Sequence, residues 1–293
     1  MPLLSLDASR PRRVSVGQVA VDSVTFSAAI AAIEALVDAR RGGIVLTPNV
    51  DHVVLASDDD RFRGAYRRCS LSLADGMPVV WAARALGRPL PEKLSGSDLR
   101  EPLMKLAAAR GFRVFLLGGA EGVARRAAAH LVATNPSLRI VGTASPQIHA
   151  ADPRERAAKR PWGSMTTEAP LRHDRRRGSR ERHALVARIK EADPDLVLVG
   201  LGAPKQELWI HEAATELSPA VLLGIGASID FLAGTARRAP PWVSRAGLEW
   251  AFRLAQEPRR MWRRYLLRDP RFVSIIVDDW LSRGAGGDAT RHR

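Results

Sequence analysis

The chain contains one cysteine, Cys69, among 293 residues. A single thiol excludes an intrachain disulfide, so the fold must depend on a buried core, and a chain of this length can form one. No neighbouring residue in the sequence would activate the thiolate of Cys69. We therefore expect Cys69 to be a packing residue rather than a nucleophile.

Two cofactor signatures are also missing. The seven histidines and the single cysteine do not fall at the spacing of a zinc site. The glycines of Gly118–Gly122 follow the pattern GGxxG, whereas dinucleotide-binding turns use GxGxxG. The sequence therefore favours neither a structural zinc ion nor a nicotinamide cofactor.

Long apolar runs are absent as well. No run reaches the roughly 18 residues that a membrane-spanning helix needs. Met1–Arg13 lacks the apolar stretch of a secretory signal. We therefore expect a chain that does not span a bilayer and is soluble or peripheral to a membrane.

Basic residues dominate the charge, with a formal net charge of +14, but they are concentrated in two windows. Residues 237–272 hold ten Arg and three acidic residues, a net charge of +7. Residues 147–183 hold ten Lys or Arg and five acidic residues, a net charge of +5. Because the remaining chain is nearly neutral, the pattern predicts a neutral globular body with two basic attachments rather than a uniformly basic nucleic-acid binder.

Short apolar runs alternate with helix-like stretches through the body of the chain. This alternation predicts an α/β fold, with a parallel Rossmann-like sheet, helices on both faces and a helical C-terminal appendage. The expected strands are Gly43–Leu46, Leu71–Leu73, Arg113–Leu117, Leu138–Gly142, Leu196–Val199 and Ala220–Ile225. Ligands of such sheets bind beyond the carboxyl ends of the strands. This sequence places there Thr47, Asn49, Asp75, Gly118, Gly119, Gly202, Gln206 and Gly226.

The chain divides into a core, an insertion and two C-terminal parts. We expect the core at residues 14–236. Residues 147–180 interrupt it with a segment rich in Arg, Pro, Ser and Thr, whose lack of periodicity favours a flexible insertion. Residues 237–272 are the expected appendage, and residues 284–293 are expected to be a disordered tail.

The appendage combines arginine with aromatic residues. It contains the stiff break Pro240-Pro241, and its pattern predicts helices at Arg245–Gln256 and Arg259–Leu267. Arginine binds phosphate through paired donors, while Trp and Tyr suit a boundary between apolar and wet surroundings. This composition predicts contact with an anionic surface, which would be a lipid headgroup layer, a diphosphate or a nucleic acid.

Two of the expected strand ends carry groups that suit catalysis or phosphate binding. Asp75 lies between small residues, and its carboxylate would either accept a proton from a hydroxyl nucleophile or cap the following helix. Gly118 and Gly119 open a helix, where exposed amides suit a phosphate, although any tight turn from strand to helix uses glycine.

The acidic run Asp58–Asp60 contains a DxD pattern of the kind that metal-dependent sugar-nucleotide enzymes use. It falls inside an expected surface helix, Ala56–Arg68, rather than at a strand end. We therefore favour a solvated surface at this run and keep a metal site as the alternative.

Five segments of the chain together resemble the WecG/TagA/CpsF glycosyltransferases of bacteria. They are Thr47–Leu99, Val114–Gly119, Pro194–Ile210, Gly224–Trp242 and Gly247–Leu266. The resemblance implies an inverting transfer from a UDP-sugar to a polyprenyl-diphosphate-linked saccharide at the cytoplasmic face of the cell membrane. The sugar would be N-acetylmannosamine, its uronic acid or a hexose such as glucose, and the products would be teichoic acid linkage units, enterobacterial common antigen or exopolysaccharides.

The resemblance also implies roles for individual residues. Asp75 matches the proposed general base, and Thr47 and Asn49 match the neighbouring active-site motif. The matches to substrate-binding positions are Gln206 and Asp230 at the sugar-nucleotide site, and Arg253, Arg260 and Arg263 in the appendage, where arginines hold the diphosphate. Lys93 stands where the family has an arginine, which keeps the charge but loses the paired donors.

No cofactor and no metal are expected. The expected partners are the UDP-sugar, the lipid-linked acceptor and an anionic membrane surface, with no nucleic acid, and homo-oligomerisation is left open. Three alternatives remain: a nucleic-acid-binding module, an inactive membrane-docked homologue, and a metal-dependent transferase that uses Asp58 and Asp60.

Overall fold

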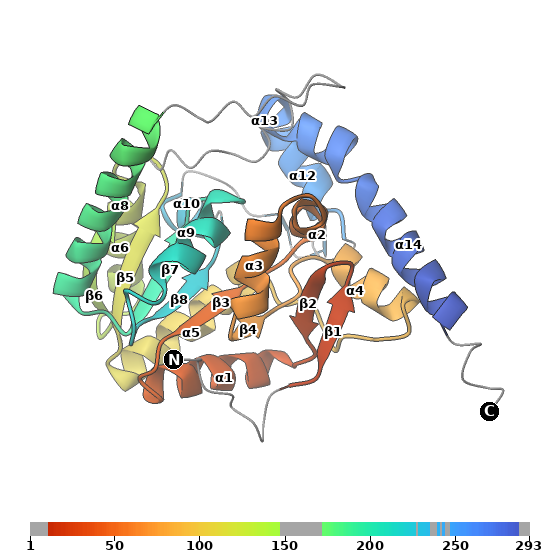
Figure 1. Cartoon of the computed structure of the whole chain (residues 1–293). Helices are drawn as coiled ribbons and strands as arrows, with labels where there is room; N and C mark the ends of the chain where they lie inside the picture. The colour runs from red at the N-terminus through yellow and green to blue at the C-terminus, as the bar shows by residue number, and fades with distance from the viewer. Residues whose placement is uncertain are drawn as a thin grey trace.

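The computed structural model describes residues 11–146, 172–226, 228–234, 239–240, 242–243 and 247–286. In these residues a six-stranded sheet has the order β4-β3-β8-β7-β5-β6 (Figure 1). Every pairing in it is parallel, which confirms the α/β prediction. The strands are β3 (Gly43–Leu46), β4 (Leu71–Ser72), β5 (Arg113–Gly118), β6 (Arg139–Ala144), β7 (Leu196–Gly200) and β8 (Val221–Gly224).

Each central strand contributes to two hydrophobic cores, one on each face of the sheet. In β5, Phe115 and Leu117 belong to one core, and Val114 and Leu116 to the other. This follows from the two-residue period of a strand, and it explains why strands buried on both faces are apolar throughout.

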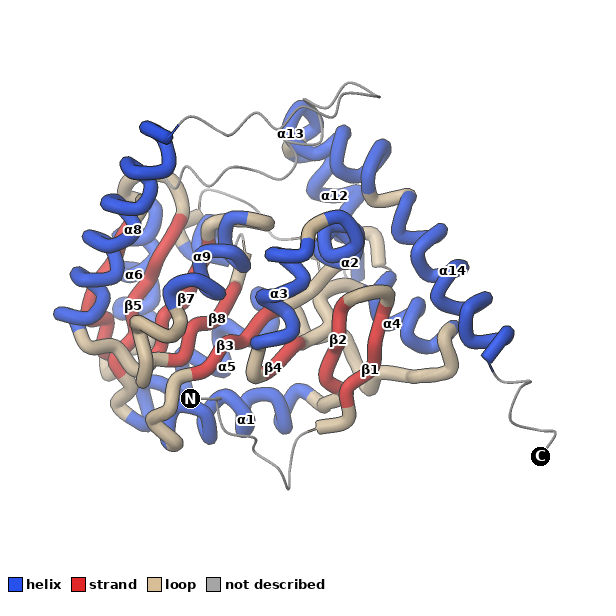
Figure 2. The backbone as a smooth tube through the Cα atoms, in the orientation of Figure 1, coloured by secondary structure: helices blue, strands red, loops and turns tan. Residues whose placement is uncertain are grey.

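Helices cover both faces, as the alternating pattern predicts (Figure 2). The side chains of one group pack in the first core: α2 (Val50–Asp58), α3 (Asp60–Arg68), α4 (Met77–Ala85), α8 (Arg172–Ala192) and α9 (Lys205–Ala213). Those of the other group pack in the second core: α1 (Phe26–Asp38), α5 (Gly96–Arg110), α6 (Val123–Thr134) and α10 (Ser228–Leu232).

A hairpin of β1 (Arg13–Val16) and β2 (Val19–Asp22) precedes the sheet and was not predicted. Its valines alternate into the first core. Asp22 accepts a hydrogen bond of 2.8 Å from Nε of Arg13 and one of 2.7 Å from the backbone N–H of Ser72. The hairpin is thereby fastened to the last residue of β4, the edge strand of the sheet.

The single helix expected at Ala56–Arg68 is two helices, because Asp59 takes an extended conformation between α2 and α3. The Asp59 side chain accepts hydrogen bonds from the backbone N–H groups of Arg61 and Phe62 and caps α3. An aspartate that serves as an N-cap ends the preceding helix, which hydrophobic periodicity alone does not reveal.

The C-terminal arm, residues 247–286, crosses the carboxyl edge of the sheet and then descends along the hairpin (Figure 1). It consists of α12 (Glu249–Gln256), α13 (Pro258–Trp262), a π-helical turn η1 (Arg263–Arg268) and α14 (Arg271–Gly286). α14 was not predicted, and it includes the first three residues of the expected tail, 284–286. The rest of that tail, 287–293, and residues 147–171 of the expected insertion lie outside the described residues, while 172–180 begin α8.

Candidate active site

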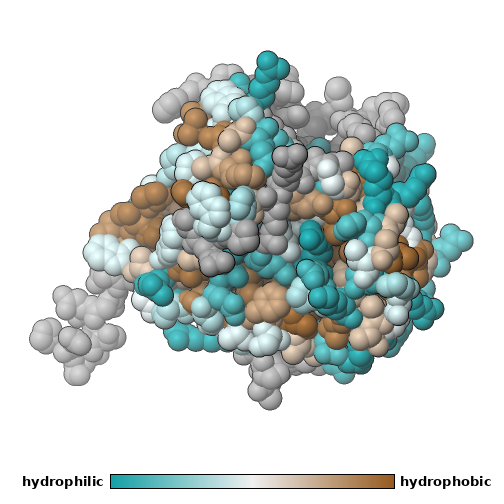
Figure 3. Space-filling view, turned by 180° about the vertical axis from the view of Figure 1, so that it is seen from behind, coloured by the Kyte–Doolittle hydropathy of each residue, from teal (hydrophilic) through white to brown (hydrophobic). Residues whose placement is uncertain are grey.

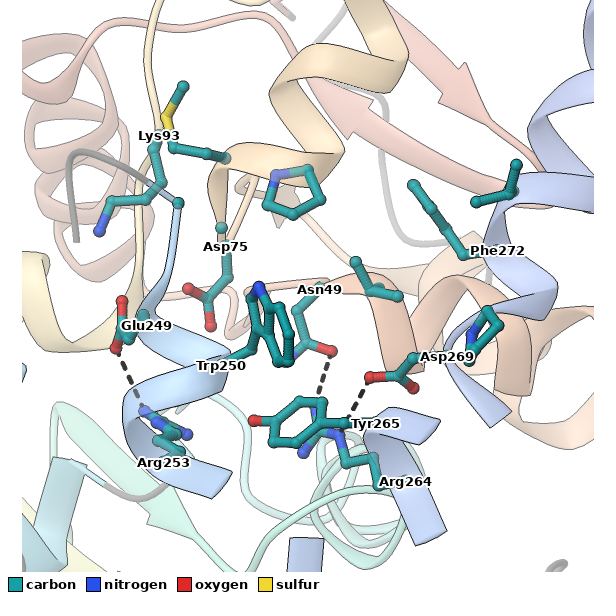
Figure 4. Close-up of a pocket in the computed structure, with 17 residues that line it drawn as sticks. Asn49, Asp75, Lys93, Glu249, Trp250, Arg253, Arg264, Tyr265, Asp269 and Phe272 are labelled. Carbon is teal, nitrogen blue, oxygen red and sulfur yellow. Dashed lines mark hydrogen bonds and ion pairs between the residues drawn. The ribbon is translucent and has the colours of Figure 1, made fainter. Parts of the chain in front are cut away.

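A pocket of about 400 Å³ lies between the core and the arm (Figure 4). The core side follows the carboxyl ends of β3 and β4, the edge at which parallel sheets bind ligands. The core residues in the lining include Asn49, Val50, Asp75, Met77 and Lys93. The arm residues include Glu249, Trp250, Arg253, Arg264, Tyr265 and Phe272.

Asp75 is half-buried at the centre of this pocket, between the residues of the core and those of the arm (Figure 4). Its backbone N–H donates to the carbonyl of Pro48 at 2.8 Å, which ties the loop after β4 to the loop after β3. Gly76, not Asp75, is the N-cap of α4, and no side chain caps that helix. The alternative that Asp75 is a helix cap is therefore wrong, and its carboxylate faces the pocket.

The surroundings of Asp75 favour its protonated form. Burial, and then the negative charge of Glu249, raise its pKa to about 6. The cations Arg253 and Lys93 act in the opposite direction and lower the pKa. A carboxylate with a pKa near neutrality is suited to accept a proton and then release it.

Two predicted cations lie in the pocket wall beside Asp75. Nζ of Lys93 lies 2.9 Å from Oδ2 of Asp98. Nη2 of Arg253 lies 3.5 Å from Oε1 of Glu249, and its guanidinium stacks over the ring of Phe231 at 5.5 Å. An ion pair with a carboxylate thus orients each of these two cationic side chains near Asp75.

A buried ion-pair cluster fastens the arm to α2. Asp51 is 1% exposed; Nε of Arg264 lies 3.3 Å from its Oδ2, and Arg268 also pairs with it. Arg264 donates from Nη2 to Oδ1 of Asn49 at 3.2 Å (Figure 4). The same Asn49 oxygen accepts from the backbone N–H of His52 and caps α2. Burial opposes the charge on Arg264, but Asp51 and then the other anionic neighbours outweigh it and raise its pKa.

The resemblance points to Arg263 at this position of the arm, whereas Arg264 is the residue that lines the pocket. Arg263 is exposed and stacks against Trp262 at 5.4 Å. After Arg253 and Arg260, an α-helical period leads to residue 263 or 264, and in the structure Arg264 is the one that faces Asn49 and Asp51. The side chain of Arg260 lies outside the described residues.

Four further predicted residues lie near the sheet edge but not in the pocket lining. Thr47 is buried, and its Oγ1 donates to the carbonyl of Gly224 at 3.2 Å. Asp230 is half-buried in α10. Gly118 and Gly119 end β5, where a Cβ on Gly118 would lie 2.2 Å from the carbonyl oxygen of Gly200. At Gly118 glycine is thus required for close approach of two strand ends.

Gln206 is buried, and both ends of its amide are engaged. Its Nε2 donates to Oε1 of Glu207 at 2.7 Å, and its Oε1 accepts from the backbone N–H of Gly226 at 2.9 Å. Through these two hydrogen bonds the buried Gln206 fixes the loop after β8 at the carboxyl edge of the sheet.

The acidic run Asp58–Asp60 has three separate partners. Asp58 pairs with Arg271 of α14 at 2.7 Å, Asp59 caps α3, and Asp60 pairs with Arg63. Across the described part of the chain, no group of three or more His, Cys, Asp or Glu side chains is placed to hold a metal ion.

Within the described residues, no helix combines the length and the apolar character that crossing a membrane requires. Cys69 is buried, and burial raises the pKa of its thiol to about 11, in agreement with a packing role.

The fold is that of an α/β protein with a pocket at the carboxyl edge of a parallel sheet, and a C-terminal arm closes this pocket. The sequence profile of the Glycosyl transferase WecG/TagA/CpsF family matches residues 14–286. The chain belongs to this family, and it is a glycosyltransferase.

Two relatives from Bacillus carry the same name, N-acetylglucosaminyldiphosphoundecaprenol N-acetyl-beta-D-mannosaminyltransferase. The chain is 29% identical to the protein of Bacillus spizizenii (strain ATCC 23059 / NRRL B-14472 / W23) over 240 residues, 82% of this chain and 80% of the relative. It is 26% identical to the protein of Bacillus subtilis (strain 168) over 243 residues, 83% of this chain and 82% of the relative.

Among solved structures, unliganded arylmalonate decarboxylase gives a TM-score of 0.24 at 18% identity, covering 68% of this chain and 94% of that chain. The Gly74Cys mutant of arylmalonate decarboxylase, in the sulfate ion associated form, gives a TM-score of 0.23 at 18% identity. That match covers 74% of this chain and 79% of the mutant chain.

Proposed function

We propose that the protein transfers N-acetylmannosamine from its UDP derivative to a polyprenyl-diphosphate-linked saccharide, with inversion at the anomeric carbon. The names of the two Bacillus relatives support this choice of sugar and acceptor. The observation that carries the proposal is Asp75, a carboxylate with a pKa of about 6 in a pocket that also contains Lys93, Arg253 and Arg264.

In this proposal an acceptor hydroxyl attacks the anomeric carbon from the face opposite to UDP. Asp75 accepts the hydroxyl proton as the new glycosidic bond forms. The bond from the anomeric carbon to the phosphate oxygen breaks, and UDP departs with that electron pair. Arg253 and Lys93, each already oriented by a carboxylate, supply positive charge beside the developing diphosphate anion.

The arm also suits contact with the membrane that carries the acceptor. Among the described residues, nine of the twelve exposed large hydrophobic side chains lie in the arm. Arginines such as Arg263 lie among them, and this combination favours an anionic lipid surface. We propose that the enzyme works at the cytoplasmic face of the cell membrane as a peripheral protein.

The proposal is tested by a panel of donors with a short-chain prenyl-diphosphate-linked N-acetylglucosamine as acceptor. We expect transfer from UDP-N-acetylmannosamine, and comparison with its uronic acid and with UDP-glucose measures the specificity. Because the proposed chemistry uses only side chains, activity is expected to persist in EDTA. Absence of transfer from every donor, with the acceptor intact and the protein folded, would reject the proposal.

The pH dependence gives a second prediction. A base must be deprotonated to work, so kcat/KM is expected to fall as the pH drops through about 6, the pKa of Asp75. Glu249 raises that pKa through its negative charge. Glu249→Gln is therefore expected to shift the acidic limb to lower pH, as measured by the pH profile of kcat/KM.

Glu101→Gln is the matched control for this shift, because Glu101 lies on the exposed side of α5 and pairs with Lys105. The acidic limb of the kcat/KM profile of Glu101→Gln is expected to lie at the same pH as that of the wild type. An unmoved limb in Glu249→Gln would mean that the limb reports a group other than Asp75.

A further inference from the structure

The charged residues next to Asp75 and the apolar residues that begin α14 lie in different parts of the pocket. Lys93, Glu249 and Arg253 lie on one side of Asp75, and Phe272 lies on the opposite side (Figure 4). Val273, the residue after Phe272 in α14, also lines the pocket. A ligand with a charged head and a hydrocarbon tail would therefore enter this pocket in one orientation.

An exposed apolar stripe continues from this side of the pocket along α14. It consists of Val273, Val277, Trp280 and Leu281, which are 46% to 64% exposed. Their spacing of four, seven and eight residues places them on one face of the helix. We call these four residues the α14 stripe.

The α14 stripe differs from the other two faces of the same helix. Phe272 is buried in the first core, with Ile275 and Ile276 packed against it. Exposed polar residues, Ser274, Asp278 and Ser282, occupy the remaining face. The stripe lies between these faces, and apolar side chains gather along the side of the molecule where α14 lies (Figure 3). Apolar residues are thus gathered on the one exposed face that leads to the pocket.

From the continuity of the apolar pocket wall with this stripe, we propose that the α14 stripe binds the first isoprene units of the acceptor's polyprenyl chain. This inference rests on the proposed function. A pocket of about 400 Å³ has room for a sugar and a diphosphate, so a polyprenyl chain must leave it. The exit past Val273 keeps the hydrocarbon in apolar contact, and the stripe then extends for about 12 Å, enough for a short run of isoprene units.

The test compares two water-soluble acceptors that differ only in their lipid, a single isoprene unit against a farnesyl chain, used below micelle-forming concentration and without vesicles. The double variant Val277→Ser/Trp280→Ser leaves every pocket-lining residue intact. Wild-type protein is expected to prefer the farnesyl acceptor. The variant is expected to lose roughly 10- to 100-fold in kcat/KM on the farnesyl acceptor, because burial of these side chains is lost.

On the single-isoprene acceptor the variant is expected to match the wild type, which also shows that it is folded. Val132→Ser, on the exposed face of α6, is the matched control and is expected to change neither activity. Equal losses on both acceptors would overturn the inference, as would no loss on either. A loss that occurs only when vesicles are added would also overturn it, because the stripe would then contact the bilayer rather than the chain. If the wild type transfers sugar to neither acceptor, the proposed function fails, and this inference fails with it.

Discussion

Asp75→Asn is expected to lower kcat for sugar transfer by roughly 10²- to 10⁴-fold, the usual contribution of a positioned general base. The substitution keeps the size of the side chain and removes its ability to accept the proton. Asp75 lies at the centre of the pocket, with its backbone N–H bound to Pro48, so the local structure has no reason to change. Turnover is measured with saturating donor and acceptor, and donor affinity by calorimetry.

Donor affinity is expected to stay close to the wild-type value, because the amide still fills the same position. It would even rise slightly if the negative charge of Asp75 repels the diphosphate. Asp60→Asn, on the exposed side of α3, is the control and should leave turnover unchanged. Normal turnover combined with weak donor binding would assign Asp75 to substrate binding instead of proton transfer.

Truncation after Ala236 is expected to abolish transfer, even to a short soluble acceptor that needs no membrane. The arm provides ten of the seventeen residues that line the pocket, including Arg253 and Arg264. Without them Asp75 would face open solvent, and the cations proposed to stabilise the departing UDP would be missing. Turnover is measured by UDP release and by formation of the lipid-linked product.

The truncated core is expected to remain folded, since both hydrophobic cores are built around the sheet and Phe272 is the only described arm residue in the buried set of the first core. Circular dichroism and a cooperative thermal transition check this point. Removal of residues 287–293 alone is the control and is expected to preserve activity. Full turnover by the truncated protein would show that the arm has no part in catalysis.

The sequence predicted the sheet, most of its helices and the position of Asp75 after a strand, because each depends on local patterns; α1 and α10 were not predicted. The alternation of apolar strands with helices gives the architecture, and the small residues around Asp75 mark a strand end. Lys93, which lies in the pocket wall, was indicated by the family resemblance rather than by a local pattern. These features need no knowledge of long-range contacts.

Other features depend on contacts between distant residues and were not predictable in the same way. Arg264 rather than Arg263 lies in the pocket wall, where it pairs with Asp51 and Asp269, and Asp51 is distant from it in the sequence. Gln206 was assigned to the ligand by resemblance, whereas its amide holds Gly226 from within the core. The catalytic and binding roles of all these side chains stay predictions until they are measured.

The pairing of Asp51 with Arg264 and Arg268 has a consequence for how the arm moves. A buried ion pair contributes little net stability, because desolvation cancels most of the attraction. The two ion pairs and the hydrogen bond from Arg264 to Asn49 nevertheless define the position of the arm on α2, while Phe272 and the isoleucines of α14 pack in the first core. An arm that detaches to exchange substrates is therefore expected to return to the position in which Asp51 faces both guanidinium groups.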